Sequence, residues 1–133
     1  MKKILIVEDE EDIQELLKFF LEDNDYQTMI ASDGIEAIDT FHRFQPDMIL
    51  LDIMIPKIDG YAVCELIRKE SKIPIIMITA LSDETNQLKG FDLLIDDYVT
   101  KPFSMPILLR KIQAIFRRID NDLNTKQELI QYK

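Results

Sequence analysis

The run MILLDIMIP, residues 48–56, decides the fold. It begins with four consecutive apolar residues, Met48 to Leu51, and an aspartate follows them directly. Continuous apolar runs of this length are typical of strands that are covered on both faces, as in a parallel sheet. Because an unpaired carboxylate is costly inside a core, we expect Asp52 to lie at the carboxyl end of this strand, at the edge of the sheet.

Similar apolar runs alternate with amphipathic segments along the whole chain. Strands are expected at residues 3–7, 26–31, 48–51 and 74–78, with a short one near Tyr98. Apolar residues at helical spacing predict helices over 13–21, 35–41, 60–70, more weakly 84–91, and 108–116, the last of them capped by Ser104. This alternation predicts an α/β protein: a single doubly wound, five-stranded parallel sheet of order 2-1-3-4-5 with five helices, flavodoxin-like.

The composition is typical of one soluble globular domain. The chain has 133 residues, of which 47% are hydrophobic and 31% are charged. Its formal net charge of −9 argues against binding of this segment to the phosphate backbone of a nucleic acid. The sequence has no apolar run of membrane-spanning length, no signal-peptide pattern and a single cysteine, so we expect a cytoplasmic protein without membrane contact.

Polar side chains stand where the expected strands end. Glu8 and Asp9 follow the first strand, Asp52 the third, Thr79 the fourth and Lys101 the fifth. In open parallel sheets, ligands bind beyond these carboxyl ends. Three carboxylates against one lysine leave an excess of about two negative charges, which a divalent cation with oxygen ligands, Mg²⁺ above all, compensates. An aspartate beside such an ion and a lysine is a plausible nucleophile toward phosphorus.

These residues resemble a known family. ILIVEDE, DMILLDIMIPKIDG, IIMITA and DDYVTKPF, in this order and on these elements, look like the receiver domain of two-component response regulators. The resemblance covers about residues 2–118. The last helix and its FRRI are similar to the winged-helix transcription-factor class. The resemblance implies a phosphorylation-activated signalling switch, which is not an enzyme but assists its own phosphotransfer and dephosphorylation.

The resemblance also assigns roles to single residues. Asp52 accepts a phosphoryl group from a sensor histidine kinase, and Lys101 follows a strand and precedes a cis proline. The implied ligands of Mg²⁺ are Glu8, Asp9, Asp52 and the backbone carbonyl of Met54. The implied partners of the phosphoryl oxygens are Thr79, Ala80 and Lys101. Thr79 and Tyr98 are the implied switch residues.

The resemblance further implies that activation produces a homodimer through helix 4, strand 5 and helix 5. The residues expected on this dimer face are Lys89, Asp96, Asp97, Lys111 and Arg118, with Asp97 paired to Lys111 and Asp96 to Arg118. The chain departs from the family at Leu93, Leu94 and Ile95, where small residues are common, and at Gln87 and Ile107, where an ion pair is common. We therefore expect an altered dimer face with more apolar contact.

The character of the sequence changes after Arg118. We expect residues 1–119 to form the receiver domain, and residues 120–133 to be a linker and the possible start of a DNA-binding output domain that is missing from this sequence. DNA would then be bound only through that domain. Within this segment ELIQY, residues 128–132, predicts either an isolated strand or the tail of the last helix.

Three other functions stay open at this stage. A metal-dependent phosphohydrolase also uses an aspartate at a strand end, but its second aspartate, two positions on, is Met54 here. A flavin or dinucleotide binder needs a glycine-rich loop after the first strand, whereas the three glycines are Gly34, Gly60 and Gly90. A receiver that no longer takes phosphate is the third alternative, although no central residue is missing.

Overall fold

Five parallel strands form one sheet in the order β2-β1-β3-β4-β5. The computed structural model describes residues 1–80 and 95–131 of the chain, and the side chains of residues 1–80 and 95–123. The strands are β1 (Lys3–Val7), β2 (Gln27–Ala31), β3 (Met48–Asp52), β4 (Ile75–Thr79) and β5 (Asp97–Thr100). The parallel pairing and the strand order are those that the sequence predicts.

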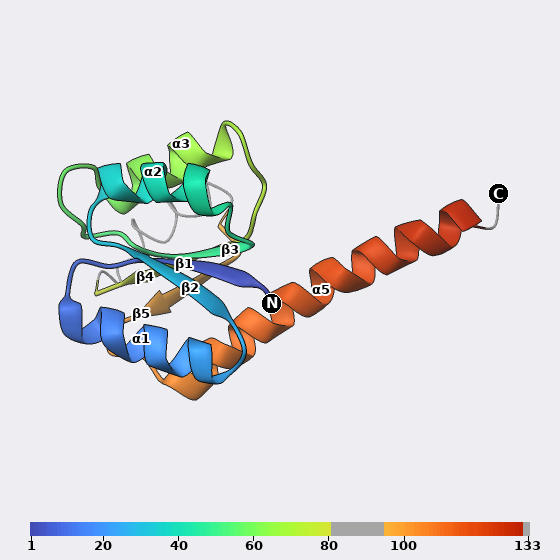
Figure 1. The fold of residues 1–133 in the computed structure, drawn as a ribbon, viewed down its shortest axis with the longest axis horizontal. Coiled ribbons are helices and arrows are strands. Elements are labelled where there is room, and N and C mark those ends of the chain that lie inside the picture. Colours follow the sequence, from blue (N-terminus) through green and yellow to red (C-terminus); the bar gives the residue numbers. More distant parts are fainter. Residues whose placement is uncertain (81–94, 132–133) are drawn as a thin grey trace. The chain divides into compact units, whose positions relative to one another are not determined.

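Helices cover both faces of the sheet. The helices α1 (Glu11–Asp23), α2 (Gly34–Phe44) and α3 (Gly60–Arg68) follow β1, β2 and β3. Figure 1 shows α2 and α3 on one face and α1 on the other, which confirms the doubly wound arrangement. The helix expected over residues 84–91 lies outside the described residues.

The centre of the sheet is buried from both sides. All five residues of β3 and of β4 are buried, as continuous apolar runs predict. In the edge strand β2 only Ala31 is buried; exposed and half-buried residues alternate before it, consistent with one face being more exposed. Asp52 is the last residue of β3 and pairs in register with Ile78, next to the end of β4. The sheet therefore brings the carboxyl ends of its strands to one edge.

The two Asp-Gly pairs start helices rather than simple turns. Asp33 accepts a hydrogen bond from the Glu36 backbone N–H at 2.8 Å and caps α2, and Asp59 accepts one from Ala62 at 2.9 Å and caps α3. Each following glycine sits against backbone. A Cβ on Gly60 would lie 2.5 Å from the Asp52 carbonyl oxygen, so only glycine lets α3 begin this close to the end of β3.

The C-terminal unit of residues 104–133 contains α5 (Met105–Gln131). The Ser104 hydroxyl accepts a hydrogen bond from the Ile107 N–H at 3.4 Å, at the start of this helix. The helix continues over most of residues 128–132, so the isolated strand considered there is wrong and the helical alternative holds. No glycine or proline follows Pro106, and Lys, Gln, Glu and Leu propagate a helix well. In the described part of the chain, no helix is long and apolar enough to span a membrane.

Candidate functional site

Three carboxylates meet at the carboxyl edge of the sheet. Glu8 and Asp9 leave the end of β1, and Asp52 ends β3; one oxygen from each lies within 4.8 Å of the others. Glu8 and Asp52 are buried, whereas Asp9 is exposed. The cluster predicted from the strand ends is therefore formed, with one member open to solvent.

A lysine from β5's end closes the cluster. The Lys101 ammonium donates to Glu8 Oε1 at 2.6 Å and to Asp52 Oδ2 at 2.9 Å, and its own side chain is only 15% exposed. The Lys101–Pro102 peptide bond is cis, as the resemblance implied. The Lys101 N–H also donates to the Thr79 carbonyl oxygen at 2.7 Å, which joins the ends of β4 and β5 beside the cluster.

Burial and hydrogen bonding have opposite effects on the pKa values of Glu8 and Lys101. Burial raises the pKa of Glu8 from 4.5 to about 7, although the hydrogen bond from Lys101 counteracts it. Burial alone would lower the pKa of Lys101, but its hydrogen bonds to Glu8 and Asp52 outweigh burial and raise it. The lysine therefore stays charged, while one of the carboxylates is held in an environment that disfavours its charge.

Both oxygens of Asp52 have a donor. Oδ1 accepts a hydrogen bond from the Met54 backbone N–H at 3.0 Å, and Oδ2 accepts the one from Lys101. A carboxylate oxygen has two lone pairs, so each retains capacity for another bond. Thr79 is fully buried at the end of β4, and Ala80, which follows it, is exposed. Tyr98 is half-buried on β5 and packs against the core cluster.

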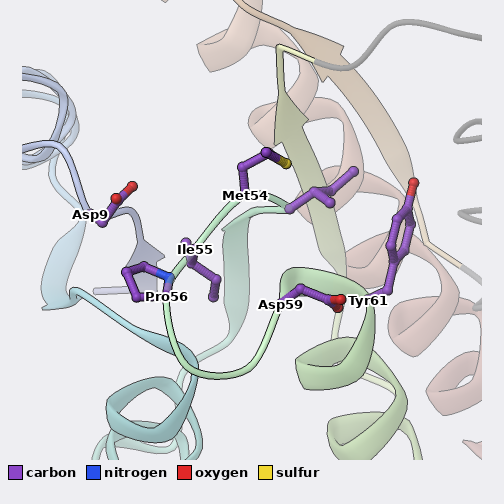
Figure 2. Close-up of a pocket in the computed structure, with 7 residues that line it drawn as sticks. Asp9, Met54, Ile55, Pro56, Asp59 and Tyr61 are labelled. Carbon is purple, nitrogen blue, oxygen red and sulfur yellow. The ribbon is translucent and has the colours of Figure 1, made fainter.

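A cavity of about 420 Å³ opens beside the cluster. Figure 2 shows Asp9 across from the loop after β3, which contains Met54, with Asp59 and Tyr61 at the start of α3. Ile53, Ile55 and Pro56 complete its lining. Asp9 lines this cavity and is exposed, whereas Glu8 is buried.

The described residues expected on the dimer face are Asp96, Asp97, Lys111 and Arg118. Asp96 has partners within its own chain: it accepts a hydrogen bond from the Ile75 N–H at 2.9 Å and lies 3.5 Å from Arg68. Asp97 is on β5, and Lys111 and Arg118 are on α5. Lys89, together with the departures at Gln87, Leu93 and Leu94, lies outside the described residues.

Three residues of the site were not singled out from the sequence. Gln14 on α1 is buried and donates to the Glu8 carbonyl oxygen at 2.5 Å. Glu10 Oε1 lies 4.0 Å from the Lys101 ammonium. Gly60 packs on the Asp52 backbone, as described above. The sequence offers one signal for Gln14, a polar residue among the apolar positions of α1. It offers none for Glu10, because residues 8–12 are all acidic.

The fold and the site together define a class of protein. It is a doubly wound α/β domain with an aspartate, two further carboxylates and a lysine at the carboxyl edge of its sheet. The oxygen donors fit Mg²⁺, since its preferred ligands are carboxylates, carbonyls and water. The lysine and the two further acids lie beside a carboxylate that can act as a nucleophile toward phosphorus.

The chain belongs to the response regulator receiver domain family, because its residues 4–113 match the family described as "Response regulator receiver domain". Among solved structures, a two-component response regulator from Clostridium difficile has a TM-score of 0.87 at 33% identity and covers 90% of this chain and 98% of that one. The BeF3-activated N-terminal receiver domain of Klebsiella pneumoniae RstA has a TM-score of 0.82 at 29% identity, with 85% and 97% covered.

The curated relatives are named as transcriptional regulators. The probable transcriptional regulator ycf27 of Guillardia theta is 50% identical over 117 residues, which are 88% of this chain and 46% of that protein. The transcriptional regulatory protein YxdJ of Bacillus subtilis (strain 168) is 46% identical over 127 residues, 96% of this chain and 56% of that protein. The chain thus spans about half the length of the curated relatives it matches. The family is that of a signalling switch in two-component systems, as the resemblance implied.

Proposed function

We propose that Asp52 accepts a phosphoryl group from a phosphohistidine of a sensor histidine kinase. A carboxylate oxygen of Asp52 forms the new bond to phosphorus as the phosphorus–nitrogen bond breaks, and the imidazole nitrogen keeps the electron pair of that bond. The observation that carries this proposal is the Asp52 carboxylate, held 2.9 Å from the Lys101 ammonium within a cluster of two further acids. Little covalent chemistry is left to the protein, so its main task is to position charges.

Mg²⁺ fits the donor set of this site. Glu8, Asp9, Asp52 and the Met54 carbonyl would hold the ion, which supplies positive charge against the incoming phosphoryl oxygens when it is bound. Lys101, which follows β5, would contribute the second positive charge. Without the ion, the cluster has three carboxylates and one ammonium within reach of one another. The excess of negative charge favours a cation before the phosphoryl group arrives.

The new acyl phosphate would act through its neighbours. Phosphorylation adds roughly −1.5 to −2 charge and three acceptor oxygens. We assign their partners as the Thr79 hydroxyl, the Ala80 backbone N–H and Lys101. Hydrogen bonds to charged groups contribute about 1.5 to 3 kcal/mol each. Two or three of them therefore approach the ~5.5 kcal/mol that moves a two-state equilibrium from 1:99 to 99:1. Thr79 and Tyr98 are the residues that we propose as the switch.

The output of this switch is a change in association. We propose that residues 1–119 form the receiver domain and that residues 120–133 lead toward a DNA-binding domain, since the named transcriptional regulators are about twice as long. The activated form would dimerise through β5, α5 and the segment between β4 and β5. The residues that we propose on this dimer face are Lys89, Asp96, Asp97, Lys111 and Arg118. Asp96 Oδ2 already contacts Arg68 at 3.5 Å, and because a carboxylate accepts several bonds, a pair with Arg118 of a second copy would add to this contact.

The experiment uses acetyl phosphate as the phosphodonor. The chain is incubated with acetyl phosphate and Mg²⁺ and its intact mass is measured, beside the Asp52→Asn variant and a sample with EDTA. We expect a labile addition of one phosphoryl group that requires Mg²⁺ and is lost in Asp52→Asn. An addition of equal extent in Asp52→Asn would contradict the assignment of the acceptor. Equal extent in EDTA would contradict the role of the ion.

A further inference from the structure

Gln14 is a buried polar residue for which the proposed chemistry has no use. It lies on α1 and is 9% exposed. Its side-chain amide nitrogen donates to the Glu8 carbonyl oxygen at 2.5 Å and to the Ser32 hydroxyl at 3.0 Å. A carbonyl oxygen can only accept, so the atom that faces Glu8 must be the amide nitrogen. Both of its hydrogens are used.

This contact fixes the peptide plane between Glu8 and Asp9. The peptide group is planar, so the Glu8 carbonyl and the Asp9 nitrogen and Cα turn together. On the other side, the Glu8 N–H donates to the Ala31 carbonyl oxygen at 3.0 Å. Both backbone polar groups of Glu8 are therefore held, by β2's last residue and by α1. A rotation of this peptide would swing the Asp9 carboxylate away from Asp52.

The loop between β2 and α2 connects Gln14 to the segment that follows Asp52. The loop between β2 and α2 contains Ser32, which accepts the second Gln14 hydrogen. In the same loop Asp33 lies 3.3 Å from the Lys57 ammonium, and at the start of α2 the Gly34 N–H donates to the Pro56 carbonyl oxygen at 3.1 Å. This loop contributes none of the three clustered carboxylates. It nevertheless contacts the segment after Asp52 directly, and the segment of Glu8 and Asp9 through Gln14.

We propose that Gln14 is a positioning residue for the cation site: it holds the Glu8–Asp9 peptide in the orientation that brings their two carboxylates to Asp52. This inference rests on the proposed function, since it concerns the same Mg²⁺ site. Residues of this kind around a metal site orient the ligands, and their replacement typically lowers metal affinity about 10- to 100-fold. Gln14 acts through Glu8 and Asp9 and touches neither the ion nor the phosphoryl group.

The test is Mg²⁺ binding by isothermal titration calorimetry. Gln14→Met keeps the length of the side chain and removes both donors, so we expect the Mg²⁺ Kd to rise about 10-fold. Ser32→Ala removes one acceptor and should raise it less. The matched control is Leu21→Val near the C-terminal end of the same helix: Leu21 is fully buried, so the variant loses stability without removing a hydrogen-bond donor to Glu8. Its Mg²⁺ Kd should equal that of the wild type.

A kinetic measurement separates positioning from simple loss of structure. With acetyl phosphate as donor, the Mg²⁺ concentration for half-maximal phosphorylation should rise in Gln14→Met, while the rate at saturating Mg²⁺ stays close to that of the wild type. An unchanged Kd in Gln14→Met overturns the inference, as does an equal weakening in Leu21→Val. If Gln14→Met does not fold, an unchanged Kd in Ser32→Ala overturns it. A wild type that binds no Mg²⁺ refutes the proposed function itself.

Discussion

Replacement of Lys101 by methionine tests how the site is held together. Lys101→Met keeps most of the side-chain volume and removes the ammonium that lies 2.6 Å from Glu8 and 2.9 Å from Asp52. The side chains of these acids are only 3% and 5% exposed. Removal of one partner from a buried ion pair typically costs about 3 to 5 kcal/mol, because the other charge stays buried without compensation.

Proton uptake by Glu8 limits this cost. Its pKa is about 7 with Lys101 present, and loss of the ammonium raises it further. A carboxyl group whose pKa is higher in the folded state destabilises that state as the pH rises from the unfolded pKa toward the folded one. We therefore expect a loss of about 3 kcal/mol near pH 8 in the absence of Mg²⁺. Near pH 6, where Glu8 is protonated, the loss should be at least ~1 kcal/mol smaller.

The assay is urea unfolding in EDTA, followed by circular dichroism at both pH values. Lys72→Met is the control, because Lys72 is exposed and such a substitution usually changes stability by less than about 0.5 kcal/mol. The double variant Glu8→Gln, Lys101→Met should regain part of the loss, since it removes one of the two buried charges. If Lys101→Met matches the wild type at high pH, the ammonium does not hold the cluster and the reasoning is wrong.

Three further predictions concern the surroundings of the site. Gly60→Ala should lower the free energy of unfolding by about 1 to 3 kcal/mol in urea, because its Cβ would lie 2.5 Å from the Asp52 carbonyl oxygen; an unchanged midpoint would contradict this close contact. The hydrogen bond from the Glu36 N–H lowers the pKa of Asp33, and Lys57 lowers it further, so folding favours the carboxylate. The wild type should lose more stability than Asp33→Asn as the pH falls from about 5 to about 3, and parallel curves would refute this. Mg²⁺ at 100 times its Kd should stabilise the wild type by about 2.7 kcal/mol, and the same concentration should stabilise Asp9→Asn less; equal thermal shifts would exclude Asp9 as a ligand.

The sequence predicts the sheet well because its signals are local. The runs at 4–7 and 48–51 are apolar throughout, which is typical of strands covered on both faces. The strand ends then place Glu8, Asp52 and Lys101 at one edge through topology alone. For this reason the three-carboxylate cluster and its lysine were predictable without coordinates.

The supporting contacts were not predictable in the same way. Gln14 contacts Ser32, which is 18 positions away, and no periodic pattern encodes that pairing. Asp96 lies 3.5 Å from Arg68 of the same chain, a contact between α3 and the residue before β5 that no local sequence pattern predicts. The two alternatives for residues 128–132 could not be decided from the sequence, because an apolar pattern over five residues does not distinguish a strand from the tail of a helix.

The position of the phosphoryl group can be measured directly. The chain is phosphorylated by a phosphohistidine-bearing sensor kinase with Mg²⁺ and reduced with borohydride, which converts an aspartyl phosphate to homoserine. Peptide mass spectrometry then identifies the changed residue. We expect homoserine at position 52 alone, in a yield that falls when Mg²⁺ is chelated. Homoserine at another aspartate, with residue 52 unchanged, would contradict this expectation.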